Sequence, residues 1–275
     1  MTAAVEPTSH TVKVRELTLH YLDWGNDGAV PLVLLHGLDG AAGDWRRVAE
    51  HFQSQYHVIA LDQRGHGDSD HAGRAYSTDD FVADLGAFVD ALGLERFILL
   101  GHSLGGHNTI AYTARHPERV ICAAANDIPL RPEHDPDESM KRFPGGQQPV
   151  YGSHEEWFED RGEASEFTPE HAHALLAESR LKQVDGGYQP KADPNAQIYW
   201  QPADLRDEAR MITRPIFFIR AGRSDSVGAA TIQEMAMAIG PARSIGLERS
   251  GTNTFLDIEE EFLANVSQFF GAHGG

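Results

Sequence analysis

The chain has 275 residues, and 23 Lys and Arg against 41 Asp and Glu give a formal net charge of −18. This length suits two domains or one large α/β domain, and 41% apolar with 23% charged residues is a globular composition. The acidity argues against binding to nucleic acid or to an anionic membrane, because that attraction needs clustered Lys and Arg.

Cysteine usage and hydropathy narrow the class further. Cys122 is the only cysteine, which excludes an intramolecular disulfide and zinc sites built from several Cys, and its apolar surroundings predict a buried structural thiol. Met1 to His10 lack the basic and apolar segments of a signal peptide. No apolar run approaches the ~18 residues that span a bilayer. We therefore expect a soluble, cytoplasmic protein.

Short apolar runs alternate with amphipathic stretches along most of the chain. The runs predict strands at residues 12–14, 17–22, 31–35, 57–61, 97–100, 120–125, 215–220 and 244–247. The amphipathic stretches predict helices at residues 81–92, 104–115, 229–239 and 258–270. This alternation predicts an α/β fold with a parallel sheet that is covered by helices on both faces.

The alternation breaks between Asp127 and Asp207, where Pro, Gly and acidic residues interrupt any strand pattern. Helices are expected only at residues 153–161 and 169–182 of this stretch. We interpret residues 1–275 as one domain with an insertion at about 128–207. The insertion is either an ordinary solvated segment or a lid over a pocket, and we favour the lid because long insertions in compact domains are often functional.

The strongest motif is Gly101-His102-Ser103-Leu104-Gly105, which lies between a predicted strand and a predicted helix. A Ser in this G-x-S-x-G context occupies a strained turn, and Gly101 and Gly105 are needed where a Cβ would meet neighbouring backbone. Ser103 is therefore the predicted nucleophile. The Leu104 N–H, at the start of the helix, is a predicted donor to a developing oxyanion.

A second oxyanion donor is expected from the loop His36-Gly37-Leu38, which directly follows the predicted strand 31–35. Gly37 lets the backbone turn inward, and the Leu38 N–H is the expected donor. We interpret His36 as a hydrogen-bonded brace of this loop and not as a base. The glycines and charges of residues 62–69 suit a tight loop near the site, to which we assign no chemistry.

These three segments make the chain resemble the α/β-hydrolase-fold serine hydrolases, above all the small bacterial esterases, lactonases and C–C-bond hydrolases. The resemblance covers nearly the whole chain. It implies an eight-stranded, mostly parallel sheet, a helical cap, and a Ser, Asp and His triad in that chain order. A Ser at position 103 argues against the dehalogenase and epoxide-hydrolase branches, which use Asp there.

The acid of such a triad is expected on the loop after the strand 215–220. Asp225 stands three residues after Gly222 and resembles the family's Gly-x-x-Asp turn, where it would orient and stabilise an imidazolium. A helix-capping role is the alternative for Asp225. Asp127, which follows the strand 120–125, is the alternative acid.

The base is missing from its expected position. Thr252 stands where the resemblance places the catalytic His, or Thr254 does if the loop is aligned differently, and no His lies between His173 and His273. His273 is expected in a mobile tail beyond the last helix. A threonine hydroxyl cannot act as the base because it does not titrate near neutral pH.

Three explanations stay open for this loss. The first is an engineered His→Thr substitution made to trap substrate, and the second is a natural non-hydrolytic protein, such as a ligand binder, lyase or cyclase. The third is a rescue base among His102, His107, His171 and His173. We predict a hydrolase of a small ester, lactone or related acyl substrate whose activity is strongly impaired. No metal or organic cofactor is implied, and oligomeric state is left open.

Overall fold

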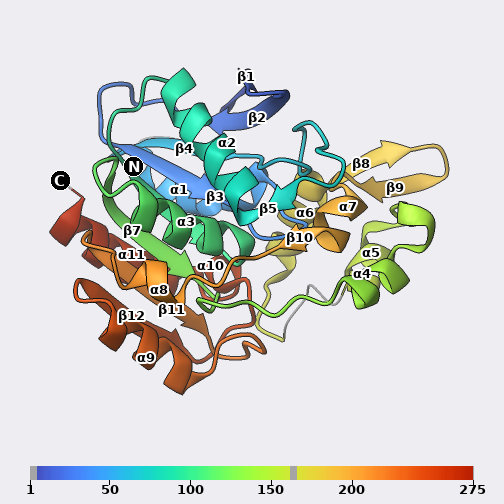
Figure 1. Ribbon diagram of the computed structural model, residues 1–275. Coiled ribbons are helices and arrows are strands. Elements are labelled where there is room, and N and C mark those ends of the chain that lie inside the picture. Colours follow the sequence, from blue (N-terminus) through green and yellow to red (C-terminus); the bar gives the residue numbers. More distant parts are fainter. Residues whose placement is uncertain (1–4, 162–165, 275) are drawn as a thin grey trace.

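An eight-stranded sheet forms the centre of the computed structural model, which describes residues 5–161 and 166–274 (Figure 1). Its strands are β1 (Thr8–Val14), β2 (Leu17–Asp23), β3 (Pro31–Leu35), β4 (His57–Leu61), β6 (Phe97–His102), β7 (Val120–Asn126), β11 (Ile216–Ala221) and β12 (Ala242–Leu247). Their spatial order is β1-β2-β4-β3-β6-β7-β11-β12. The β1–β2 and β2–β4 pairs are antiparallel and the other neighbours are parallel. The predicted mostly parallel sheet is confirmed.

The central strands bury both of their faces, which produces two hydrophobic cores. In β3, Val33 and Leu35 belong to one core, whereas Leu32 and Leu34 belong to the other. A parallel strand between two layers of helices needs apolar side chains at every position, which explains the unbroken apolar runs in the sequence. Cys122 lies in the core that contains Leu32 and Leu34, where burial raises the pKa of its thiol to about 12.

Helices cover both faces of the sheet, as predicted. The core that holds Val33 is completed by α2 (Thr78–Ala91), α3 (Leu104–Arg115) and α9 (Ala229–Ala238). The opposite core is completed by the helices η1 (Ala42–Trp45), α1 (Arg46–Phe52), α10 (Thr254–Asp257) and α11 (Glu259–His273). The sequence analysis did not predict η1 or α1.

The C-terminal end differs from its prediction. The single helix expected at 258–270 is instead α10 followed by α11, which continues to His273. The prediction that His273 lies in a mobile tail is wrong. His273 is the last residue of α11, and its ring packs against Phe269 with 4.9 Å between the ring centroids.

Between β7 and β11 the chain leaves the main sheet. This segment contains α4 (Pro136–Arg142), η2 (Pro144–Gly146), α5 (His154–Arg161), α6 (Glu170–Arg180), β8 (Leu181–Val184), β9 (Gly187–Pro190), α7 (Pro194–Ile198), β10 (Trp200–Gln201) and α8 (Arg206–Ala209). Figure 1 shows α4, α5 and the β8–β9 hairpin grouped on the side away from both termini. The insertion predicted at 128–207 falls in this segment, although 162–165 lie outside the described residues.

The C-terminal half of this insertion is tied to loops of the main sheet. β10 pairs in parallel with the short strand β5 (Tyr76–Ser77). The Tyr76 hydroxyl donates to Asp193 at 2.6 Å, and the Asp193 N–H donates to the Gly65 carbonyl at 2.7 Å. In the N-terminal half of the insertion, α4 has no buried residue.

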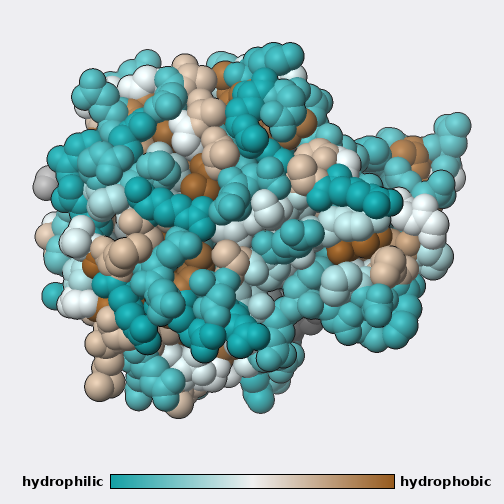
Figure 2. All heavy atoms as spheres, in the orientation of Figure 1, coloured by the Kyte–Doolittle hydropathy of each residue, from teal (hydrophilic) through white to brown (hydrophobic). Residues whose placement is uncertain are grey.

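The visible face of the molecule is mostly hydrophilic, with scattered hydrophobic residues, and the part of the insertion with α4, α5 and the β8–β9 hairpin projects from the main body as a lobe (Figure 2). Within the described residues, no helix is both long enough and apolar enough to cross a membrane.

Candidate functional site

Ser103 occupies a strained turn between β6 and α3. Its φ of 49° and ψ of −116° lie outside the regions that L-residues ordinarily adopt. A Cβ on Gly101 would lie 2.1 Å from the Gly105 carbonyl oxygen, and a Cβ on Gly105 would lie 2.2 Å from that of Leu35. Since these neighbours are backbone atoms, the turn requires glycine at both positions, as the motif predicted.

The predicted oxyanion donors lie on two loops that are hydrogen-bonded to each other. The Gly105 N–H donates to the His36 carbonyl at 3.1 Å, which holds the loop of Leu38 against the start of α3, where Leu104 lies. A Cβ on Gly37 would lie 3.3 Å from the Ser103 Cβ, so glycine permits this close approach. The structure therefore brings the Leu38 and Ser103 loops together.

His36 is buried and braces its loop. Its Nδ1 lies 2.7 Å from the Gly37 carbonyl oxygen, and the Gln63 N–H donates to its Nε2 at 3.0 Å. Burial lowers the pKa of His36 to about 3, so the ring is neutral at physiological pH. Both ring nitrogens are thus engaged in loop contacts, which leaves neither available as a base.

Buried imidazoles are expected to make the protein less stable as the pH falls below 6.5. Burial lowers the folded-state pKa of His36 to about 3 and that of His107 to about 4, from 6.5. The unfolded chain therefore binds more protons than the folded chain in this window, and the free energy of unfolding falls with pH. His107→Gln should flatten this dependence by up to about 1.4 kcal/mol per pH unit. Urea unfolding across this pH range measures the slope, and an unchanged slope would contradict the prediction.

Ser103 opens into a cavity of about 370 Å³ that Asp225 also lines. The lining residues are Ser103, Ile128, Pro129, Arg131, Pro132, Glu133, Trp200, Asp225 and Ser226. Asp225 is exposed at this cavity. The structure thus brings the predicted nucleophile and the predicted acid to one space. The insertion contributes the rest of the lining through Trp200 and five of the residues between 128 and 133.

Asp127, the alternative acid, lies buried at the end of β7. Its carboxylate accepts the Ala221 N–H at 3.1 Å and a hydrogen bond from the Ser224 side chain. Burial raises the pKa of this carboxyl group despite these hydrogen bonds. Asp127 therefore lies against the loop that carries Asp225, and the two carboxylates are electrostatic neighbours.

The segment that contains Thr252 lies beside both the Asp225 loop and the Ser103 turn. The Arg223 N–H donates to the Ser250 carbonyl at 2.9 Å, which joins the loops that follow β11 and β12. Thr254 is buried, and its hydroxyl donates to Asn126 Oδ1 at 2.9 Å. The Asn126 carbonyl in turn accepts the Ser103 N–H at 2.8 Å. Thr252 is exposed.

The four histidines considered as rescue bases occupy other environments. His102 packs its ring against Phe255, with 5.3 Å between centroids, and His107 is buried with its Nε2 3.1 Å from the Thr78 hydroxyl. His171 and His173 lie on α6 and line other cavities. Among the described residues that line the Ser103 cavity there is no histidine.

The insertion contacts the loop of His36, Gly37 and Leu38 through Asp39, which was not identified from the sequence. The Asp39 carboxylate accepts hydrogen bonds from the guanidinium group of Arg161 on α5 and from the side-chain amide of Gln197 on α7. Asp39 directly follows Leu38 and adopts a φ of 63°. The side chains of Asp39 and Arg161 are only 8% and 2% exposed.

Asp39→Ala is expected to lower the free energy of unfolding by about 3–5 kcal/mol, because it leaves the buried Arg161 charge without its partner. Chemical denaturation measures the loss. The exposed Glu138–Lys141 pair, with 67% and 70% of the side chains accessible, supplies the control, and Glu138→Ala should change stability by less than about 0.5 kcal/mol. Equal effects of the two variants would contradict the structural role of Asp39.

One group of side chains in the described part of the chain could hold a metal ion. His20, Asp62 and Asp68 offer ligand atoms within 4.8 Å of one another. They lie near β2 and the end of β4, in a cavity that does not include Ser103. The described residues around the Ser103 turn form no comparable group of metal-ligating side chains.

Relatives of known activity resemble this chain over most or part of its length. A 2-(acetamidomethylene)succinate hydrolase of Mesorhizobium japonicum is 28% identical over 82% of this chain and 81% of that protein. A non-heme chloroperoxidase of Streptomyces lividans is 36% identical, but this match covers only 43% of the chain and 45% of the peroxidase.

The fold is found in solved structures and in a family model. The crystal structure of E-2-(acetamidomethylene)succinate hydrolase is similar with a TM-score of 0.82 at 23% identity, and the match covers 96% of this chain and 99% of that one. The enol-lactonase of Burkholderia xenovorans gives a TM-score of 0.77 at 21% identity, covering 95% and 100%. The family model for the alpha/beta hydrolase fold matches residues 30–234. The chain belongs to the alpha/beta hydrolase fold family.

Proposed function

We propose that the protein is a serine hydrolase scaffold for a small ester, lactone or related acyl substrate, with Ser103 as the nucleophile. The observation that carries this proposal is the strained Ser103 turn at the N-terminus of α3, facing a cavity of about 370 Å³. A cavity of this size is near the lower limit of ligand pockets, which run from about 300 to 1,000 Å³, and supports a small substrate. The similarity to a hydrolase over most of both chains supports hydrolysis as the reaction class.

The proposed reaction begins with attack of Ser103 Oγ on the substrate carbonyl carbon. The backbone N–H groups of Leu38 and Leu104 would stabilise the oxyanion. Asp225 would support an imidazolium, with Asp127 as the alternative acid. The step without an assigned base is the removal of the Ser103 proton, because the family resemblance puts the expected His at the position of Thr252.

Without a base, Ser103 remains a protonated alcohol and a weak nucleophile. Loss of a triad His lowers turnover by roughly 10⁶-fold, although about 10³–10⁴-fold over water persists from the oxyanion hole and binding. We therefore expect substrate binding with very slow turnover.

The second candidate function is non-hydrolytic: a ligand binder, lyase or cyclase that uses the same cavity. The observation that favours it is Thr252 itself, together with the lack of histidine among the described residues lining the Ser103 cavity. Such a protein would need the cavity and not the triad.

Hydrolysis of short p-nitrophenyl esters by Thr252→His, compared with the unaltered chain, separates the two functions. Turnover that appears in Thr252→His and depends on Ser103 supports the hydrolase. A folded Thr252→His protein without turnover favours the non-hydrolytic alternative.

A further inference from the structure

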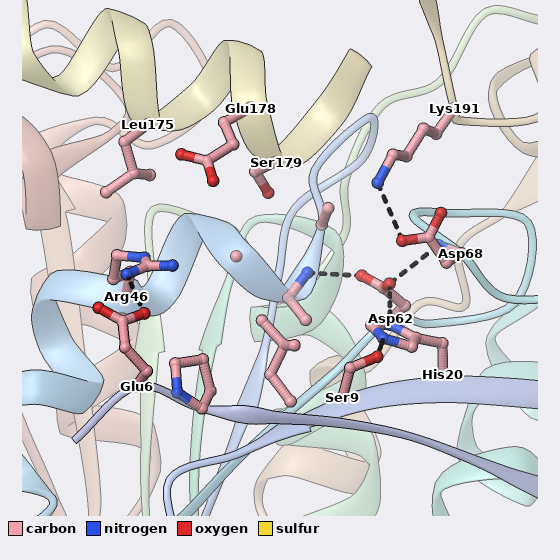
Figure 3. Close-up of a pocket in the computed structure, with 15 residues that line it drawn as sticks. Glu6, Ser9, His20, Arg46, Asp62, Asp68, Leu175, Glu178, Ser179 and Lys191 are labelled. Carbon is pink, nitrogen blue, oxygen red and sulfur yellow. Dashed lines mark hydrogen bonds and ion pairs between the residues drawn. The ribbon is translucent and has the colours of Figure 1, made fainter. Parts of the chain in front are cut away.

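A Ser, His and Asp group lies away from the Ser103 turn, in a cavity lined by β1, β2 and the insertion (Figure 3). Ser9 lies on β1, His20 on β2, and Asp62 directly after β4. The β1–β2 register pairs Ser9 with Leu22 and Thr11 with His20, so Ser9 and His20 are diagonal neighbours on one face. The Asp62 N–H donates to the His20 carbonyl at 3.0 Å. The fold therefore places the three side chains in a row across three neighbouring strands.

The three side chains form a continuous hydrogen-bonded chain. Ser9 Oγ lies 2.8 Å from His20 Nε2, and His20 Nδ1 lies 2.6 Å from Asp62 Oδ2. A carboxylate can only accept, so a neutral His20 carries its proton on Nδ1 and accepts from the Ser9 hydroxyl at Nε2. This is the order of contacts that activates a serine nucleophile.

Asp62 is fixed as an ionised acceptor. Burial by itself would raise its pKa, but hydrogen bonds from His20 and from the Asp68 and Ala42 N–H groups hold the pKa below its ordinary value. The two N–H groups donate at 2.9 Å and 2.5 Å. Gly67, at a φ of +52°, leaves the space that the carboxylate fills, because a Cβ there would lie 2.1 Å from it. The local backbone is thus built around this carboxylate.

Ser9 faces a cavity of about 290 Å³ and is itself exposed to solvent. The charged residues that line this cavity are Glu6, Arg46, Asp62, Asp68, Glu178 and Lys191. Arg46 is paired with Glu6 at 2.7 Å, and Lys191 with Asp68 at 2.9 Å. Since these cations are already paired and acids predominate, the cavity favours a neutral or cationic ligand over an anion.

We propose that Ser9 is a second nucleophile of this protein, activated by His20 and Asp62 and directed at small neutral or cationic esters. This site goes beyond the proposed function at Ser103 and does not depend on it. Ser9 Oγ would attack the ester carbonyl carbon while its proton passes to His20 Nε2. The alkoxide then leaves with that proton, which forms an acyl-Ser9 ester and an alcohol. Water attacks the acyl group through the same base, which releases the carboxylic acid and restores Ser9.

We expect slow reaction at Ser9, because it lies in an extended strand and not at the N-terminus of a helix. An activated reagent that forms a stable adduct is therefore the suitable probe. In diisopropyl fluorophosphate, attack of Ser9 Oγ forms an O–P bond, the P–F bond breaks and fluoride leaves. The Ser9 proton passes to His20 and then to solvent.

The chain contains its own comparison sites for this experiment. Ser267 Oγ lies 2.9 Å from His51 Nε2, but the carboxylate of Glu259 acts on that imidazole only as a nearby charge, whereas Asp62 lies within hydrogen-bond distance of His20 at 2.6 Å. Ser103 has the strained turn but no histidine lining its cavity among the described residues. Tryptic peptide mass spectrometry of the full chain after exposure to diisopropyl fluorophosphate reports the adduct at all three serines at once.

We expect the adduct to form on Ser9 faster than on Ser103 or Ser267. His20→Asn should slow labelling of Ser9 by about 10²–10⁴-fold, the usual contribution of a general base, and leave Ser267 unaffected. Circular dichroism checks that the variant is folded. A folded wild-type chain with unlabelled Ser9, equal labelling of Ser9 and Ser267, or labelling of Ser9 that is independent of His20 would each overturn the proposal. Labelling of Ser103 would bear only on the proposed function.

Discussion

Thr252→His is expected to raise the turnover of short p-nitrophenyl esters by at least about 10³-fold, and by up to about 10⁶-fold if the triad geometry is fully restored. The reason is that this change would supply the base that the proposed mechanism at Ser103 requires. Ser103 lies in its strained turn, and the loop of Thr252 is hydrogen-bonded to the loop of Asp225 through Arg223 and Ser250. Thr252 is also exposed, so a larger side chain can be accommodated there. The measurement is kcat and KM for p-nitrophenyl acetate and butyrate.

Controls identify the groups responsible for any gain. Thr252→Ala should stay at the basal rate, and the double variant Thr252→His with Ser103→Ala should lose the gain. In the Thr252→His background, Asp225→Asn and Asp127→Asn show which carboxylate supports the new imidazole, since only that change should lower kcat sharply. A gain that survives Ser103→Ala would show that the nucleophile is not Ser103.

Gly105→Ala is expected to reduce the free energy of unfolding by more than about 3 kcal/mol, or to prevent folding. The added Cβ would lie 2.2 Å from the Leu35 carbonyl oxygen and 2.6 Å from the His36 carbonyl oxygen. Both are backbone atoms of the sheet and its loop, so relief of the overlap requires α3 to move away from β3. Urea unfolding measures the loss.

Gly86→Ala is the matched control for this prediction. Gly86 lies inside α2, and its Cβ would lie 3.8 Å from the Tyr112 ring, which is ordinary contact. Alanine at this helical position should therefore stabilise the protein by about 0.5–1 kcal/mol. A Gly105→Ala protein within about 1 kcal/mol of wild type would contradict the close packing at the elbow.

The parts of the fold that the sequence predicted are those in which local pattern and tertiary environment agree. Strands β3 and β4 have the predicted bounds, because their apolar runs are buried on both faces. Helix α1 was not predicted, since its buried residues Val48, Ala49 and Phe52 form a short pattern among charged residues. The β8–β9 hairpin was missed as well, because most of its residues are partly exposed and carry little hydrophobic signal.

In the candidate site, too, features specified by neighbouring residues were predicted, whereas contacts between residues distant in sequence were not. The Ser103 turn was predictable because Gly101 and Gly105 lie within two residues of Ser103 in the sequence. Together the three residues specify one local backbone conformation. The contacts of Asp39 with Arg161 and Gln197 join residues more than a hundred positions apart, with separations of 122 and 158. Ser9 and His20 are 11 positions apart, and His20 and Asp62 are 42 apart. Their proximity depends on the register of β1 on β2 and on the pairing of β2 with β4. No local pattern in a single sequence specifies such pairings.

The pairing of β10 with β5 has a consequence for the route by which a molecule reaches Ser103. This pairing, with the Asp193 contacts to Tyr76 and Gly65, makes the returning arm of the insertion continuous with the main domain. The outgoing arm is fixed near its start, where Ile128 and Leu130 are buried in the core and the Leu130 carbonyl accepts the Leu205 N–H at 2.9 Å, whereas α4 further along buries none of its side chains. Entry should therefore occur by displacement of α4 and the residues just before it, 131–142, on one side. We therefore expect the returning arm to stay fixed while this part of the outgoing arm moves. The extent of that movement should limit the size of the molecules that reach Ser103.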